Sequence, residues 1–508
     1  MKNKQWIALS CAALLVAGTL AGCSSGKEDK PVDAANKKST EDNSPFEISI
    51  AGEQVGEIPK KGNEVEQAIE KYTNTKLNIQ WIPLSAYNDK VNVMIASNEL
   101  PKLLKARVTP TITKAIETGL FWEIGPLLKD YKNLSAQNPL HFDNLAVNGK
   151  KYGVPIFRDI GRAGIIYRKD WLDALGMKLP TNMEQWYEVL KAMTLNDPDK
   201  NGKNDTFGIV LYKNYSEGPN NLFTRLAVNQ GAPNKWGVDN GKFTPDFTTK
   251  EYNDVLIMFR KLFAEKLINQ DFAVFDEEES RKLLDSGRAG FMINVAKNGK
   301  AMQERISKNN PNAVLDVEPM VGPKGIRVAG EPGNAGFYLI PKSAVRTEAE
   351  LKKVLTFLDR LMEPQMSTLL LRGIEGKHYV KTADNRTEYK DFALYQREIK
   401  PYNDNFISFE GYNVAPLKDS PIGEKGFTIE KENMKYAVPN PALTLTSVTY
   451  TERGRELEQM IQDAQTKFIM GKIDEAGWQA EVDKWRKAGG DKLIKEYEDS
   501  YAKTAAMK

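Results

Sequence analysis

The sequence contains very little cysteine and histidine, and this shortage excludes several kinds of protein. Two cysteines, Cys11 and Cys23, and two histidines, His141 and His378, occur among its 508 residues. Cys11 lies in an N-terminal apolar run that we expect to be removed, so the mature chain would form no internal disulfide. The two histidines lack the spacing of a zinc hydrolase site, which would have too few ligands.

Other catalytic patterns are also missing. The chain has no G-x-S-x-G turn, no G-x-x-x-x-G-K-[ST] phosphate loop and no G-x-G-x-x-G dinucleotide motif. We therefore expect neither nucleotide chemistry nor an enzyme. Because a carboxylate pair can come from anywhere in a chain, a glycoside hydrolase remains the enzymatic alternative.

Neither sign of charge is in large excess. The formal net charge is +3, and it falls to +1 when Lys2 and Lys4 are removed with the N-terminal segment. No basic patch or acidic tail stands out, so we expect no nucleic-acid partner.

The N-terminal residues have the pattern of a secretory signal. A basic start precedes an apolar run that is shorter than the roughly 20 residues of a spanning helix. The segment LAGC, ending at Cys23, resembles the bacterial lipobox, in which the cysteine is acylated and becomes the new N-terminus. We expect a signal peptide at residues 1–22, fatty acyl chains such as palmitate on Cys23, and a location on the outer face of the cell membrane.

Residues 23–45 are polar and charged, and should form a disordered tether. From Phe46 onward, β-like runs alternate with helical patterns, which indicates α/β lobes. Val65, Ile69 and Tyr72 share one helical face, and the following LNIQWIPL alternates apolar and polar residues as a strand does.

Several tryptophans follow helical spacing and predict core packing. Thr181 and Glu184 form a capping-box pattern before a helix that carries Trp186 on its apolar face. Near the C-terminus, Trp478 and Trp485 belong to another such face.

Other aromatic residues lie among turn-forming residues. Trp236 lies in GAPNKWGVDNG, and Tyr402 and Phe406 lie in KPYNDNFISFEGYN. No core explains an aromatic residue on a loop, so these three are candidates for ligand contact. The alternative is that each covers the edge of a lobe.

The segment DPDKNGKNDT places oxygen atoms at every second position around a glycine, as in an EF-type calcium loop. The candidate ligands in chain order are Asp197, Asp199, Asn201, the Lys203 carbonyl and Asp205. Position 12 is Gly208 instead of glutamate, so Thr206, water or a distant residue would have to complete the shell. Calcium is favoured over magnesium because the loop is flexible and rich in oxygen. The alternative is a loop of Asx turns without metal.

Seven segments in order carry a family resemblance. They are KKYGVPIF, IIYRKDWLDALGMKLPTNMEQWYEVLKAM, DPDKNGKNDTFGI, SGRAGFMIN, NAGFYLIPKSA, RGIEGKHY and AGGDKLIKEYEDSYAK. Together they resemble the large lipoprotein branch of the family 1 extracellular solute-binding proteins, the ABC-importer receptors of Gram-positive bacteria, and are similar to alginate-oligosaccharide-binding proteins. The chain departs from the family at NELPKLLKA, where Lys102 replaces an acid, so any ligand contact through that acid is in doubt.

The resemblance implies two α/β lobes of the type II periplasmic-binding-protein fold, with the ligand in a cleft between them. Crossing strands are expected near residues 156–161, 325 and 373. Lobe 1 would comprise residues 46–157 and 325–372. Lobe 2 would comprise residues 158–324 and 373–508.

The implied function is capture of an oligosaccharide by a monomeric, lipid-anchored receptor that delivers it to an ABC permease. Arg158 and Asp159 beside the first crossing and Asn334 beside the second are expected to contact the sugar, together with Trp236, Tyr402 and Phe406. The resemblance also implies a structural calcium ion in the 197–206 loop, away from the cleft. The alternatives are a lipid-anchored glycoside hydrolase and a peptide-binding or adhesive lipoprotein.

Overall fold

The computed structural model of the chain describes residues 44–54 and 56–506. The expected signal peptide, and the expected tether except for its last two residues, lie outside the described residues. From Pro45 onward the chain forms one unit, which two separate sheets divide into two lobes. None of the described helices is both long enough and apolar enough to cross a membrane.

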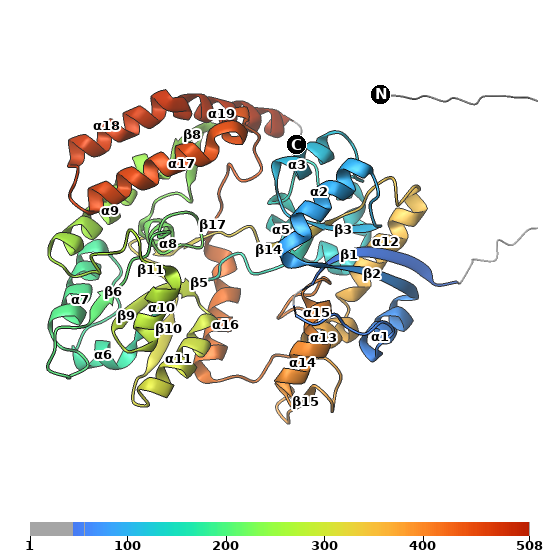
Figure 1. The fold of residues 1–508 in the computed structure, drawn as a ribbon, viewed down its shortest axis with the longest axis horizontal. Coiled ribbons are helices and arrows are strands. Elements are labelled where there is room, and N and C mark those ends of the chain that lie inside the picture. Colours follow the sequence, from blue (N-terminus) through green and yellow to red (C-terminus); the bar gives the residue numbers. More distant parts are fainter. Residues whose placement is uncertain (1–43, 55, 507–508) are drawn as a thin grey trace, which may run out of the picture. The chain divides into compact units, whose positions relative to one another are not determined.

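A five-stranded sheet with the order β2-β1-β3-β14-β4 forms the centre of the first lobe (Figure 1). β1 runs parallel to β2 and β3, whereas β14 runs antiparallel to both β3 and β4. The strands are β1 (Phe46–Gln54), β2 (Thr75–Pro83), β3 (Leu103–Ala106), β4 (Val154–Phe157) and β14 (Asn334–Leu339).

Both faces of this sheet are covered. Successive residues of a strand face opposite sides, and Ile50 packs in one hydrophobic core of the lobe while Ala51 packs in the other. The remaining elements of the lobe are α1 (Glu64–Thr73), α2 (Tyr87–Ser97), α3 (Pro110–Glu117), α4 (Lys132–Ser135), α5 (Leu140–Asp143), α12 (Glu348–Leu361), α13 (Pro364–Arg372), β15 (Tyr379–Lys381), β16 (Thr387–Tyr389), α14 (Phe392–Glu398) and α15 (Lys400–Asn403).

The second lobe is built on a four-stranded sheet with the order β10-β5-β9-β6. Its strands are β5 (Ala163–Arg168), β6 (Phe207–Ile209), β9 (Ala289–Val295) and β10 (Leu315–Glu318). Ile165 and Ile166 again belong to different cores, so this sheet is also buried on both faces. The larger core includes residues from α6 (Lys169–Ala174), α7 (Met183–Leu195), α8 (Leu222–Gln230), α9 (Lys250–Ala264), α17 (Val448–Ile469), α18 (Glu475–Trp485) and α19 (Asp491–Ala506).

The opposite face of the second sheet packs against α10 (Glu277–Asp285), α11 (Asn298–Asn309) and α16 (Pro421–Asn433). Short ladders complete the lobe. They are β7 (Trp236–Asp239) with β8 (Lys242–Pro245), β11 (Val321–Gly322) with β12 (Gly325–Ile326), and β13 (Val328–Ala329) with β17 (Ala437–Val438).

The α/β two-lobe expectation is confirmed, as are the helical faces that carry tryptophan. Trp186 is fully buried, and Trp478 and Trp485 are buried as well. The expected cap of α7 differs by one residue. The helix begins after Asn182, whose side chain accepts a hydrogen bond from the Gln185 backbone N–H. Thr181 is not the cap, because its hydroxyl donates to the Gln185 side chain instead.

Two adjacent segments connect the lobes, residues 158–162 between β4 and β5 and residues 330–333 between β13 and β14. They are hydrogen-bonded to each other, because the N–H of Arg158 donates to the Gly333 carbonyl (3.0 Å) and that of Glu331 to the Ile160 carbonyl (2.9 Å). Gly333 has a φ of +77°, and a Cβ there would lie 2.7 Å from the Nδ1 atom of His141. The backbone at this crossing is therefore closely packed.

The third connection differs from the expectation. The sequence analysis assigned residues from 373 onward to the second lobe, but Tyr395, Ile399 and Phe409 pack in the core of the first lobe. The chain returns to the second lobe only before Ile422 of α16. The aromatic residues of this stretch follow no helical or strand spacing, so neither their burial nor the core that they join could be predicted from the sequence.

A buried ion-pair cluster holds the first two crossings together. Glu331 is 4 % exposed, and its carboxylate accepts hydrogen bonds from Arg162 (2.6 Å) and Arg225 (3.2 Å). Arg225, on α8, is only 1 % exposed. Glu331 therefore supplies a charge that Arg225 requires, since an unpaired buried charge is strongly unfavourable.

We expect Glu331→Gln to lower the free energy of unfolding by about 3–5 kcal/mol, because it leaves Arg225 buried without a counterion. Adding Arg225→Met should recover most of that loss, since no buried charge then remains unpaired. Chemical denaturation measures both effects, with Glu432→Gln on the exposed face of α16 as the control. A loss below 1 kcal/mol in the single variant would contradict this account.

Candidate functional site

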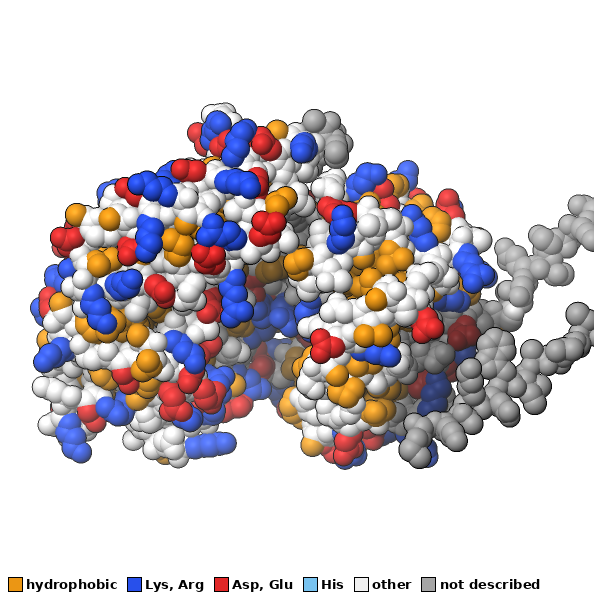
Figure 2. All heavy atoms as spheres, turned by 45° about the horizontal axis from the view of Figure 1, so that its top comes forward, with side chains coloured by type: hydrophobic (Ala, Val, Ile, Leu, Met, Phe, Trp, Pro, Cys, Tyr) orange, Lys and Arg blue, Asp and Glu red, His pale blue; other side chains and the backbone are white. Residues whose placement is uncertain are grey.

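A cleft of about 360 Å³ lies between the lobes beside the first crossing. The first lobe contributes the end of β4 and the segment that follows α15, and the second lobe contributes the turn after β9 and part of α16. Lysine and arginine side chains gather in the hollow between the two halves (Figure 2). The charged residues that line the cleft are Arg158, Asp159, Arg162, Lys297, Asp404, Glu410 and Glu430.

The acids of the second-lobe side are neutralised by lysines. Asp159, 3 % exposed, pairs with Lys297 (2.9 Å) and with Lys431 (2.7 Å), and Glu430 pairs with Lys297 (3.0 Å). Burial alone would raise the pKa of Asp159, but the two ammonium groups hold that pKa below its usual range. The Asp159 carboxylate is thus ionised and already has its partners.

The acids of the first-lobe side are paired too. Glu410 forms two hydrogen bonds with the buried guanidinium of Arg372 (2.6 and 2.7 Å). Asp404 forms an ion pair with Lys400. No carboxylate among the described residues that line the cleft is left without a cation.

Arg158 is the exception among the charges of the cleft. Its backbone N–H is bonded to Gly333, but its guanidinium forms no hydrogen bond or ion pair with any residue that the structure describes. The side chain reaches solvent. Partial burial, and next the neighbouring charge of Arg162, lower its pKa, an effect that the carboxylates of Glu331 and Asp404 partly oppose from a distance. Arg158 is therefore a free, five-donor cation in the cleft.

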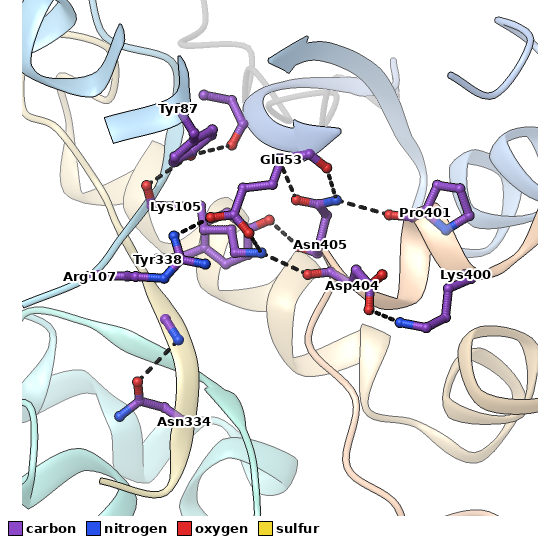
Figure 3. A network of polar contacts seen from close by, with 12 residues as sticks. Glu53, Tyr87, Lys105, Arg107, Asn334, Tyr338, Lys400, Pro401, Asp404 and Asn405 are labelled. Atoms are coloured by element: carbon purple, nitrogen blue, oxygen red, sulfur yellow. Dashed lines mark hydrogen bonds and ion pairs between the residues drawn. The ribbon is translucent and has the colours of Figure 1, made fainter. Parts of the chain in front are cut away.

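A network of polar contacts holds the wall of the cleft that the first lobe provides (Figure 3). Glu53 on β1 pairs with Lys105 (2.8 Å) and with Arg107, both on or directly after β3. Lys105, 2 % exposed, donates to the backbone carbonyl of Asp404 (2.8 Å). The Asn405 side chain accepts from the Glu53 N–H (2.7 Å) and donates to its carbonyl (2.8 Å). These contacts fix the loop that carries Asp404.

Lys102, where the chain departs from the family pattern, directly precedes β3 and so lies at the opposite end of this strand from Arg107. The Lys102 ammonium donates to the Glu47 carbonyl (2.9 Å) and lies 4.0 Å from the centre of the Phe46 ring. Lys102 does not line the cleft.

The structure brings together Arg158 and Asp159 but not the three candidate aromatic residues. Tyr402 and Phe406 are each 1 % exposed and belong to the core of the first lobe. Residues 400–403 form α15 instead of a loop, which turns these rings inward. Trp236 lies in a separate pocket of the second lobe, against the Tyr497 ring (5.1 Å).

Asn334 lies beside the cleft without lining it. Its side chain accepts from the Gly336 N–H (3.1 Å) and donates to the Pro332 carbonyl (3.2 Å), so it stabilises a local turn next to Ala335, which lines the cleft. Lys297 and Asn298 also line the cleft and were not predicted. Their position, separated by two residues from the end of the strand-like SGRAGFMIN, could have indicated them.

The 197–206 loop gathers most of its expected oxygen donors. The Asp197 carboxylate accepts from the N–H groups of Asn201 and Gly202 (both 3.0 Å). The Asn201 amide NH₂ donates to Asp199 (2.9 Å) and to Asp205 (3.1 Å). One carboxylate oxygen of Asp199 is buried without a hydrogen-bond partner among the described residues.

Thr206 and Gly208, at the end of that loop, do not complete a ligand shell in this structure. The Thr206 hydroxyl donates to the Met193 carbonyl (2.9 Å), and a Cβ on Gly208 would lie 2.6 Å from the Leu190 backbone, so no glutamate fits there. In the described part of the chain, no group of three or more His, Cys, Asp or Glu side chains is arranged to hold a metal as it stands.

Comparison with known proteins gives consistent results. The family model of the bacterial extracellular solute-binding proteins matches residues 57–362. Lipoprotein LipO of Bacillus subtilis (strain 168) is 37% identical over 98% of both chains. The polygalacturonan/rhamnogalacturonan-binding protein YtcQ of the same organism is 34% identical over 99% of both.

Solved structures share the fold at lower sequence identity. The alginate-binding protein AlgQ2, in a crystal structure without calcium ion, has a TM-score of 0.60 at 16% identity, covering 90% of this chain and 98% of its own.

Proposed function

Because the chain belongs to the bacterial extracellular solute-binding proteins, we propose that it captures an acidic oligosaccharide outside the cell and delivers it to the permease of an ABC importer. The observation that carries this proposal is the unpaired guanidinium of Arg158 in a cleft whose carboxylates are all paired. The name of the relative YtcQ, which binds polygalacturonan and rhamnogalacturonan, supports the same ligand class, because these polymers carry carboxylates.

The chemistry of the cleft matches a uronic acid. A guanidinium binds a carboxylate through two parallel hydrogen bonds, which supplies both energy and orientation. The acids that could repel such a ligand are neutralised by lysine or arginine. The Phe409 ring reaches the edge of the cleft from the first core, and the Lys431 ammonium lies 3.9 Å from its centre.

Ligand capture would close the cleft. The lobes meet through narrow crossing segments, and closure of this kind is known for periplasmic binding proteins. A ligand that contacts both lobes binds the closed form better and shifts the population toward it. A closed receptor then presents a different surface to its permease.

We expect Arg158→Ala to weaken binding of trigalacturonate roughly 10- to 100-fold, since a hydrogen bond to a charged group contributes about 1.5–3 kcal/mol. Arg158→Lys should recover only part of the affinity, because an ammonium lacks the forked geometry. Isothermal titration calorimetry measures both, with Arg281→Ala on α10, which pairs within its own helix, as the matched control.

Two results would contradict the proposal for the cleft. One is equal trigalacturonate affinity in the Arg158→Ala variant and the unmodified chain. The other is release of shorter sugars during prolonged incubation, abolished by one carboxylate substitution, which would favour the glycoside hydrolase.

Lipid anchoring at Cys23 is part of the proposed function, and the relative LipO is itself named a lipoprotein. In cells, Cys23→Ala should abolish both the lipid mass and the partition into membranes, because no other mature thiol can be acylated. Cys11→Ala is the matched control and should stay lipidated. Membrane attachment of the Cys23→Ala variant at unchanged mass would rule out the lipobox.

The loop of residues 197–206 is proposed to hold a calcium ion that stabilises the second lobe. Asp197, Asp199, Asn201 and Asp205 would bind it through side chains and Lys203 through its carbonyl. The Asn201 NH₂ now bridges two carboxylates. Turning this amide over would present its oxygen to a cation at the same place.

Chelation should lower the melting temperature of the unmodified protein, because calcium at 100 times its dissociation constant adds about 2.7 kcal/mol. The double variant Asp197→Ala with Asp199→Ala should have a lower melting temperature, and that temperature should not change when chelator is added. Lys203→Ala, which keeps the carbonyl, should behave as the unmodified chain does. The sugar affinity of the folded variants should change less than about threefold.

Two outcomes would contradict a structural calcium ion in this loop. A metal-free protein that does not respond to chelator or added calcium has only turns in this loop. A hundredfold loss of sugar affinity in the folded double variant would place the ion in the ligand site.

A further inference from the structure

A second pocket, of about 410 Å³, lies wholly within the second lobe and shares no lining residue with the cleft. It is enclosed by the loop before α8, β7, the short helix Asp246–Thr248, α9, and the inner face of α17. Its volume lies within the range of small-molecule sites, about 300–1,000 Å³. Neither the family nor the proposed function accounts for a cavity at this place.

An unsatisfied amide lines this pocket. Gln465 on α17 is only 1 % exposed, and neither its Oε1 nor its Nε2 atom has a hydrogen-bond partner among the described residues. Buried polar groups are almost always hydrogen-bonded, and leaving both ends of an amide unsatisfied is costly. The neighbours of Gln465 on the same helix face, Leu457 and Ile461, are apolar. A polar residue here therefore indicates a partner that donates and accepts hydrogen bonds.

A buried carboxylate lines the same pocket. Asp246 is 5 % exposed and accepts one hydrogen bond, from the Phe247 N–H (2.8 Å). Burial raises the pKa of Asp246 to about 6, an increase that the nearby Lys235 ammonium opposes. Lys235 itself is held by the Ser216 carbonyl (3.2 Å). Glu217, Arg455 and Glu458 also line the pocket, so three carboxylates and two cations face it and an anionic ligand is not favoured.

Flat aromatic rings provide the apolar part of the lining. Trp236, half-buried, and Trp485, 3 % exposed, both line the pocket, as does Tyr252. Trp485 is held edge-on against Phe247, with ring centres 4.9 Å apart. Aromatic faces beside amide and carboxylate groups suit a ring with C–H faces and hydroxyl edges.

We propose that this pocket is a second ligand site that binds a neutral sugar of one or two rings. Its hydroxyl groups would donate to Asp246 and both donate to and accept from the Gln465 amide, while the indole rings contact its C–H faces. This inference does not rest on the function proposed for the cleft, because it uses none of the same residues. An acidic sugar would face the carboxylates of Asp246, Glu217 and Glu458, which outnumber the cations Lys235 and Arg455 in the lining.

The test is titration of the whole chain with D-galactose, D-glucose and L-rhamnose, followed by tryptophan fluorescence. We expect at least one of these neutral sugars to change the fluorescence saturably. Gln465→Leu should bind that sugar at least tenfold more weakly and yet melt at a higher temperature, since it removes the unsatisfied amide. Gln479→Leu, an exposed glutamine on α18, is the matched control and should bind normally.

Asp246→Asn provides a second variant that keeps the shape of the pocket, and it should also weaken neutral-sugar binding at least tenfold. Arg158→Ala should leave this binding unchanged even where it abolishes binding of trigalacturonate, so the two sites fail independently. The proposal is overturned if none of the three sugars binds, or if binding is lost in Arg158→Ala and kept in Gln465→Leu.

Discussion

The buried carboxylate of Glu331, which Arg162 and Arg225 share, holds the two crossing segments to each other and to α8 of the second lobe. Glu331 lies on the second crossing segment, whose backbone is bonded to the first crossing at Ile160. Because a charge at this depth is stable only when paired, the two crossings are locked at one end of the cleft. Close to Glu331 on the same segment, Gly333 has a left-handed conformation. The first crossing carries Arg158, whose guanidinium remains available to a ligand.

The pairing of charged side chains differs between the cleft, the sheet behind it and the pocket at Gln465. In the cleft, lysines and arginines satisfy every lining carboxylate among the described residues, and the Arg158 guanidinium has no partner among these residues. Behind that wall, Lys105 is buried and bound to both Glu53 and the loop at Asp404, so the first lobe holds a cleft loop through its own sheet. The pocket at Gln465 differs from the cleft, because it is lined by both carboxylates and cations and contains a buried amide without a hydrogen-bond partner among the described residues.

Features that depend on local spacing could be predicted from the sequence, whereas features that depend on distant packing could not. The apolar face of the helix with Trp186 follows from the spacing of its own residues, and the strand β2 follows from its alternating apolar and polar residues. Tyr402 and Phe406 lie among Asn, Asp and Pro and read as a loop, but α15 turns them into the first core. Nothing near residue 373 shows which lobe the next segment joins, because both cores accept the same apolar side chains. Lys297 reaches Asp159 across 138 positions of sequence, so its role becomes visible only in three dimensions.

If an acidic oligosaccharide draws the two lobes together around Arg158, the chain becomes more compact when it binds. Small-angle X-ray scattering of the whole chain, with and without saturating trigalacturonate, measures this change. We expect the radius of gyration to decrease on addition of trigalacturonate, and to stay unchanged at the same concentration in the Arg158→Ala variant. Saturating binding of trigalacturonate, verified by calorimetry in the same sample, with no change in the radius of gyration would contradict this expectation.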